Sequence, residues 1–261
     1  LQLPLNNCGV MALDFETDNG IATSIGHSPI SGLIDPVAGS RNSIAEALTN
    51  IIWAPIKDNI RGISLSANWM WPCKNKGEDA RLFKAVEAVS EFAIDLGINI
   101  PTGKDSLSMN QKYKDQEVKS PGTVIISATG HCENINFVVE PVFKKNYGSI
   151  YYINLSNDKF KLGGSSFSQI MGNVGLETPS IQNPEFFKKT FNVVQDLIKN
   201  ELIIAGHDIG SGGLITSLLE MCFPSINISA NIDLSALNEK DSVKLLFSEN
   251  CGLIIQSKSE E

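Results

Sequence analysis

The stretch Ser43-Ile-Ala-Glu-Ala-Leu-Thr-Asn50 is the most informative part of this chain when taken together with Ile100-Pro-Thr-Gly-Lys-Asp-Ser106 and Gly206-His-Asp-Ile-Gly-Ser-Gly-Gly213. A helical pattern over the first stretch places Glu46 and Asn50 on one face. Carboxylate and amide oxygens are hard ligands of the kind that bind Mg²⁺. The glycines of the third stretch allow backbone N–H groups to approach an anion. Together the three stretches indicate a nucleotide site that uses a metal ion.

Each of these motifs also has an ordinary structural interpretation. Ser43 and Glu46 have the spacing of a capping box, in which Glu46 bonds back to the first backbone donors of a helix. Asp208 would cap the helix expected after it, and His207 would be a packed, hydrogen-bonded residue rather than a base. Lys104 lies in a polar stretch whose glycine spacing does not match a phosphate-binding loop. The residues alone leave these alternatives open.

The composition describes a folded protein with an acidic surface. The chain has 261 residues, of which 42% are hydrophobic, enough for one large domain or two of ordinary size. Its net charge of −8, with scattered basic residues, argues against nucleic-acid binding. No apolar run approaches the ~20 residues that span a bilayer, and no secretory signal is visible. We therefore predict a cytoplasmic protein without a membrane or nucleic-acid partner.

The spacing of the cysteines and the start of the sequence each support one further prediction. The five cysteines lack any Cys-x-x-Cys pair, so we predict buried, reduced thiols rather than disulfides or a zinc site. The chain opens on the apolar segment Leu1 to Leu5 without a methionine. We interpret it as a fragment of a longer protein.

Hydrophobic periodicity predicts two domains, residues 1–145 and 146–261, separated by a charged, glycine-containing break at 144–148. In the first domain the pattern predicts a hairpin of strands 11–14 and 20–26, a helix over 78–96, and strands 63–68, 124–130 and 137–141. Asp35-Pro36 offers one further helix start and Ser43 a second, and we predict a helix over 43–54. In the second it predicts strands 150–155, 202–205 and 252–256 with helices after Ser165, over 184–200 and over 213–222. The fold class is therefore α+β, arranged in α/β layers.

Five islands of sequence also occur in the order and approximate spacing of a known family. They are Glu46-Ala-Leu-Thr-Asn50, Leu65-Ser-Ala-Asn-Trp69, Ile100 to Ser106, Leu162-Gly-Gly-Ser165, and His207-Asp208 with the following Gly212-Gly-Leu214. On these residues the chain resembles the phosphoribosylformylglycinamidine synthase family over essentially its whole length. The closest correspondence is to the second of the two pseudo-symmetric synthetase halves of the large, single-chain form. The resemblance implies an aminoimidazole-ribonucleotide-synthetase-like N-terminal domain, followed by a C-terminal α/β domain of the same superfamily.

The resemblance also implies a set of site residues. The implied metal ligands are Asn7, Glu46, Asn50 and Asp208, and the implied nucleotide contacts are Asn6, Lys104 and Gly210. Two positions depart from the family pattern, which commonly has an acidic ligand at Asn7 and a serine at Gly210. An amide supplies a dipole and no charge, so Asn7 weakens a magnesium site.

The resemblance finally implies an activity for the parent protein. Such an enzyme is an ATP- and glutamine-dependent carbon–nitrogen ligase that makes formylglycinamidine ribonucleotide in purine biosynthesis. ATP activates the amide oxygen as a phosphate ester, ammonia displaces the phosphate, and Mg²⁺ offsets charge on the transferring group. We assign no catalytic residue to this half and expect it to be inactive alone. Its implied role is structural, through an auxiliary ATP or ADP site with Mg²⁺.

The implied partners are the remaining synthetase half and the glutaminase domain, and we expect the isolated fragment to form a homodimer. Two alternatives remain open. One is a scaffold half whose metal site has decayed and which binds no nucleotide. The other is a stand-alone ATP-dependent synthetase of the same superfamily.

Overall fold

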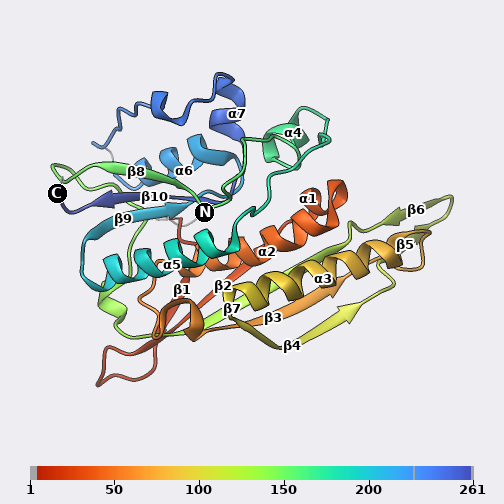
Figure 1. Cartoon of the computed structure of the whole chain (residues 1–261), viewed down its shortest axis with the longest axis horizontal. Helices are drawn as coiled ribbons and strands as arrows, with labels where there is room; N and C mark the ends of the chain where they lie inside the picture. Colours follow the sequence, from red (N-terminus) through yellow and green to blue (C-terminus); the bar gives the residue numbers. More distant parts are fainter. Residues whose placement is uncertain (1–4, 226, 260–261) are drawn as a thin grey trace.

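Figure 1 shows the computed structural model, which describes residues 5–225 and 227–259. A five-stranded sheet and a three-stranded sheet lie in separate layers, with helices packed between and around them. The larger sheet has the strand order β1 (Gly9–Ala12), β2 (Gly20–His27), β7 (Thr123–Cys132), β3 (Ile63–Met70) and β4 (Asn99–Ser106). Its neighbouring strands are antiparallel except for the parallel pair β3 and β4. This mixed sheet confirms the predicted α+β class.

The predicted hairpin at the start of the chain is confirmed, because β1 and β2 pair antiparallel, but β1 covers residues 9–12 and not the predicted 11–14. Burial alternates strictly along β2, so one face packs inward and the other faces outward. The inward face lies against helix α2 (Pro36–Ile51). Gly26 permits this close approach, since a Cβ atom there would lie 2.2 Å from the backbone oxygen of Ser43. The helix that carries Glu46 and Asn50 is therefore fixed tightly on the sheet.

The predicted start of that helix at Ser43 is wrong. Helix α2 begins at Pro36, and the Asp35 side chain caps it by accepting a hydrogen bond from the Val37 N–H at 2.8 Å. An aspartate N-cap followed by proline is a strong start signal, and it prevails over the serine within the helix. Ser43 instead donates its hydroxyl to the Gly39 carbonyl at 2.9 Å. Because Ser43 and Glu46 lie within the helix and not at its start, the capping-box interpretation of Glu46 is also wrong.

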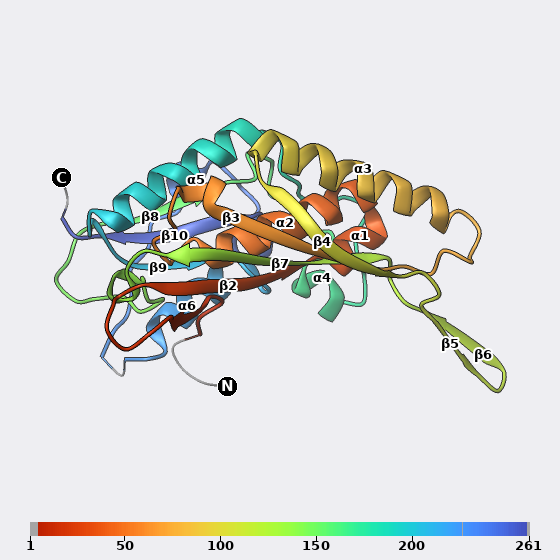
Figure 2. The ribbon, with the colours of Figure 1, turned by 90° about the horizontal axis from the view of Figure 1, so that it is seen from below.

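The structure also defines the remaining helices and strands of the first part of the chain. Helix α3 (Glu78–Leu96) confirms the prediction over 78–96. The short helix α1 (Pro29–Ile34) and the 3₁₀ helix η1 (Asn59–Gly62) precede it in the chain. The polar stretch around Lys104 is an edge strand, β4, which pairs with β3. The unpredicted hairpin of β5 (Asn110–Tyr113) and β6 (Gln116–Lys119) projects away from the body (Figure 2).

The strand predicted over 137–141 is absent from the described structure. A 3₁₀ helix, η2 (Ile135–Phe137), is followed by extended backbone that hydrogen-bonds to two different neighbours. The Val139 N–H donates to Trp53, and the Gly206 N–H donates to Glu140. Single hydrogen bonds to separate partners do not make a strand ladder. The strand was predicted from hydrophobic content alone, which does not show whether a pairing partner is present.

The second part of the chain is built on the smaller sheet, with the order β8 (Ile150–Asn154), β10 (Gly252–Ser257) and β9 (Ile203–Asp208). Its helices are α4 (Ser166–Ile170), α5 (Pro184–Lys199), α6 (Gly213–Cys222) and α7 (Ser242–Phe247), with the 3₁₀ helix η3 (Ser235–Leu237). Strand β9 continues beyond the predicted end at residue 205, so His207 and Asp208 lie in the strand and not in a turn. None of the helices in the described part is long and apolar enough to cross a membrane.

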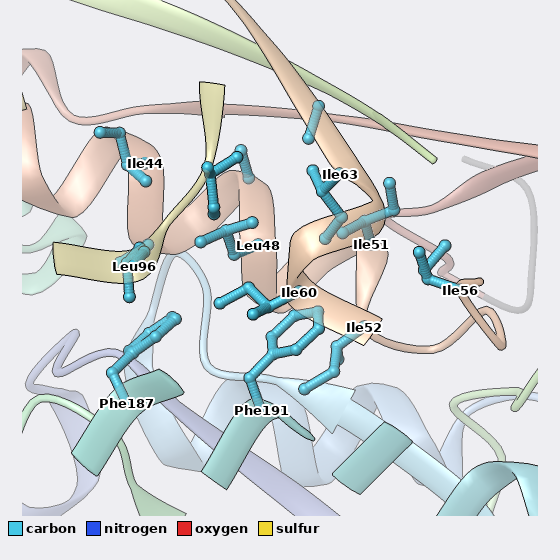
Figure 3. Packing of buried hydrophobic residues seen from close by; sticks show 14 of the residues in the cluster. Ile44, Leu48, Ile51, Ile52, Ile56, Ile60, Ile63, Leu96, Phe187 and Phe191 are labelled. Atoms are coloured by element: carbon cyan, nitrogen blue, oxygen red, sulfur yellow. The ribbon is translucent and has the colours of Figure 1, made fainter. Parts of the chain in front are cut away.

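One hydrophobic core joins the two parts of the chain (Figure 3). Phe187 and Phe191 of α5 are fully buried and pack with Ile44 and Leu48 of α2. The core thus crosses the boundary predicted at residues 145 and 146. The five cysteines are free, but only Cys132 is buried, so the expectation of buried thiols holds for that residue alone.

Candidate functional site

Two pockets adjoin at the side chains of His27 and Glu46, which line both. The first, here called the turn pocket, has a volume of about 420 Å³. Its lining includes the glycine-rich turns at 163–166 and 209–211, together with Asn42, Thr49, Glu249 and Cys251. The second, here called the sheet pocket, has a volume of about 600 Å³ and is lined by Asn7, Asn50 and residues of β2 and β7.

Glu46 stands where the two pockets meet. Its carboxylate accepts a hydrogen bond from the His27 N–H at 2.6 Å, and the His27 ring lies 3.7 Å from the same oxygen. The hydrogen bond with Glu46 raises the pKa of His27 to about 9, although partial burial of the ring acts in the opposite direction. The carboxylate is thus held in place from the end of β2 while remaining part of both pocket walls.

Asn50 lies one helical turn after Glu46 and lines the sheet pocket. Its side-chain nitrogen donates to the Ile25 carbonyl at 2.8 Å, which fixes the amide plane. Its side-chain oxygen is buried and has no hydrogen-bond partner within the described residues. A buried acceptor without a partner is costly, and a water molecule, a donor or a cation beside it would offset that cost.

Asp208 is nearly inaccessible, with 2% of its surface exposed, and its carboxylate is surrounded by donors. The Asn7 amide nitrogen donates to both carboxylate oxygens, at 3.2 and 3.0 Å. The indole N–H of Trp53 donates to Oδ1 at 3.4 Å, and His207 Nδ1 lies 3.3 Å from the same oxygen. Asp208 therefore acts as an acceptor within the protein and does not cap the following helix.

His207 is buried as well, which confirms the prediction of a packed, hydrogen-bonded histidine. Burial alone would lower the pKa of His207, but its hydrogen bonds to Asp208 and Glu220 raise it to about 9. Both ring nitrogens therefore lie within hydrogen-bond distance of carboxylate oxygens. Its second partner is the Glu220 carboxylate, at 3.0 Å from Nε2.

The residues present fit a cation only in part. Glu46 and Asn50 offer a carboxylate and an unsatisfied amide oxygen, which are ligands that Mg²⁺ accepts. Asn7 turns its NH₂ group, and not its oxygen, toward Asp208. Over residues 5–225 and 227–259, no three His, Cys, Asp or Glu side chains gather closely enough to hold a metal ion by themselves.

The three implied nucleotide contacts do not come together. Gly210 lines the turn pocket, next to the turn that carries Gly163 and Gly164. Lys104 lies on the edge strand β4, where its ammonium group donates to Ser106 at 2.6 Å, and it lines neither pocket. Asn6 is exposed beside Asn7 and also lines neither pocket.

Glu249 is a site residue that the sequence reasoning missed. Its carboxylate accepts hydrogen bonds of 2.7 Å from the backbone N–H groups of both Ser166 and Gly212. It thereby joins the two glycine-rich turns on either side of the turn pocket. The only signal in the sequence is a polar Ser-Glu-Asn run before β10, which is too common to single out a residue.

Comparison with known proteins gives two matches to protein families. Residues 1–131 match the family described as FGAR-AT PurM_N-like domain, and residues 153–261 match AIR synthase related protein, C-terminal domain. Probable phosphoribosylformylglycinamidine synthase of Caenorhabditis elegans is 40% identical over 100% of this chain and 20% of its own length. Phosphoribosylformylglycinamidine synthase of Homo sapiens is 37% identical over 98% of this chain and 19% of its own length. The chain thus spans about a fifth of the length of these relatives.

Solved structures share the fold. Thermotoga maritima PurL complexed with FGAR superposes with a TM-score of 0.69 at 14% identity, over 98% of this chain and 40% of that one. The ADP complex of the same protein gives a TM-score of 0.64 at 13% identity, over 97% and 38%. The match over residues 1–131 and the similarity to these relatives over nearly the whole of this chain confirm the family expected from the five islands. The chain therefore belongs to the FGAR-AT PurM_N-like domain family.

Proposed function

We propose that this chain is one synthetase half of an ATP- and glutamine-dependent ligase that makes formylglycinamidine ribonucleotide. The name shared by the relatives from C. elegans and H. sapiens supports this activity for the whole protein. We further propose that this half holds ATP or ADP with Mg²⁺ in the turn pocket and the sheet pocket, in a structural role. PurL structures of the same fold are complexes with ATP, ADP and FGAR, which supports a nucleotide as the ligand.

The observation that carries the ligand proposal is the unpartnered oxygen of Asn50. It is buried in the wall of the sheet pocket and follows the Glu46 carboxylate by one helical turn. Glu46 and Asn50 would hold the cation, which supplies positive charge to offset the phosphates. The glycine-rich turns at 163–166 and 209–211 would contact the nucleotide through backbone and hydroxyl groups.

Calorimetric titration with ADP and Mg²⁺ tests this proposal. Replacing Asn50 with leucine removes the amide oxygen while keeping a similar volume, and we expect the affinity for the nucleotide–metal pair to fall about 10- to 100-fold. Asn68→Leu is the matched control, because Asn68 also has a buried oxygen without a partner in the described structure but lines neither pocket. Equal affinity of the two variants would contradict the proposed cation site.

A scaffold half that binds no nucleotide is the second candidate. The hydrogen bonds from Asn7 to Asp208 favour it, because they close that side of the site without a ligand. The same titration distinguishes the two candidates. A titration of the unaltered chain without heat or saturation at millimolar ADP and Mg²⁺ would select the scaffold.

We also propose that the outer face of the larger sheet binds another synthetase half, or a second copy of this chain when that half is absent. Three large apolar side chains are exposed there: Met11 at 73%, Ile25 at 57% and Ile21 at 37%. An exposed apolar surface of this kind favours association.

Sedimentation equilibrium tests this assembly. We expect a dimer at micromolar concentration, and we expect Ile21→Asp to shift it toward monomer because a carboxylate would be buried without a partner. Val243→Asp is the control, since Val243 is equally exposed, at 37%, but lies on α7 away from this sheet. A strictly monomeric chain of 28.3 kDa at high micromolar concentration would refute the proposal.

A further inference from the structure

The segment before β1 contacts the end of β9. Asn7 and Asp208 are 201 residues apart in sequence, yet the Asn7 amide nitrogen donates to both oxygens of the Asp208 carboxylate, at 3.2 and 3.0 Å. The two parts of the chain are therefore joined at this point by a side-chain contact. A single NH₂ group bonded to both oxygens occupies the position in front of the carboxylate.

The protein itself compensates the charge of Asp208. Besides Asn7, the Trp53 indole donates to Oδ1, and the His207 ring lies within hydrogen-bond distance of the same oxygen. His207 is in turn held by Glu220 from its other nitrogen. A buried carboxylate is stable when its oxygens receive several hydrogen bonds, so Asp208 needs no metal ion to remain buried.

The chemical identity of residue 7 decides how this contact is made. Aspartate has nearly the same shape as asparagine but would place a second carboxylate at about 3 Å from Asp208. Two carboxylates at that separation repel each other unless a proton or a cation lies between them. The amide removes the repulsion and adds two hydrogen bonds.

We propose that the Asn7 amide takes the place of a bridging cation, so that the segment before β1 is fastened to Asp208 without a metal ion. The oxygens of Glu46 and Asn50 then remain as the only proposed cation ligands among the described residues of the site. This inference concerns the same site as the proposed function but does not require that a nucleotide bind. It also means that Asp208 is a structural acceptor in this chain and not a metal ligand.

Thermal unfolding of the nucleotide-free chain in EDTA tests the inference. We expect Asn7→Asp to lower the Tm by about 4–8 °C, because it replaces two hydrogen bonds by a repulsion at a buried carboxylate. Millimolar Mg²⁺ is expected to restore more than half of that loss, since the ion would bridge the two carboxylates. Asn6→Asp is the matched control, because it adds the same charge at the neighbouring residue, which is also exposed but makes no hydrogen bond with Asp208 in the described structure.

Asn7→Ala separates the hydrogen bonds from the charge. It is expected to lower the Tm less than Asn7→Asp and to gain no more from Mg²⁺ than the unaltered chain does. The inference is overturned if Asn7→Asp and Asn6→Asp have the same Tm in EDTA. It is also overturned if Mg²⁺ raises the Tm of Asn7→Asp by no more than it raises the Tm of the unaltered chain. A failed ADP titration together with the expected melting results would reject the nucleotide site and leave the Asn7 contact standing.

Discussion

Replacing Phe191 with alanine is expected to lower the free energy of unfolding by about 3–5 kcal/mol, which is a large part of the stability of an ordinary domain. The ring belongs to α5 and is fully buried in the core that also contains Ile44 and Leu48 of α2. The alanine variant would lose the apolar contacts of this ring and leave a cavity in the core, because the surrounding side chains relax only partly.

Urea unfolding followed by circular dichroism measures this effect. Phe186→Ala on the same helix is the control, because that ring is 39% exposed and its loss leaves no closed cavity. We expect the control to cost about 1 kcal/mol or less. A loss below about 1 kcal/mol for Phe191→Ala would show that α5 is not an integral part of the main core.

Replacing Gln195 with leucine is expected to cost a similar amount, about 3–5 kcal/mol, through backbone groups rather than through volume. The Gln195 side chain is completely buried and serves the loop after α2. It accepts from the Ile56 N–H at 2.7 Å and donates to the carbonyls of Ile52 and Ala54 at 2.5 and 3.0 Å. Leucine fills the space but leaves these three groups buried without a partner.

The measurement is the same urea unfolding, with Gln116→Leu as the control. Gln116 has the same side chain and lies exposed on the projecting hairpin, so its replacement is expected to be nearly neutral. Unchanged stability of Gln195→Leu would mean that the loop after α2 finds other hydrogen-bond partners or water.

Local patterns predicted the elements whose burial is periodic along the chain. Helix 78–96 buries one regular face and β2 of the first hairpin alternates between buried and exposed residues, and both patterns leave a period in the sequence. The edge strand β4 carries Gly103, Lys104 and Asp105, and such residues are typical of loops. Its strand conformation comes from pairing with β3, which no local pattern records.

In the candidate site, too, local contacts were predictable from the sequence and long-range contacts were not. Glu46 and Asn50 share a helix face, so their proximity follows from helical geometry and was predictable. The contact of Asn7 with Asp208 and the bridge made by Glu249 depend on how distant segments pack. For Asn7 the family resemblance pointed to the position but implied a ligand oxygen, whereas the structure presents the NH₂ group.

The shared core has a consequence for the synthesis of this protein on the ribosome. The last strand of the larger sheet ends at Cys132, but the helix that covers the core begins only at Pro184, about 50 residues later. At typical elongation rates of about 5–20 residues per second, this interval lasts roughly 3–10 s. During that time the part of the core that Phe187 and Phe191 later complete lacks these two rings. The first part of the chain therefore completes its core only after α5 has left the exit tunnel and docked.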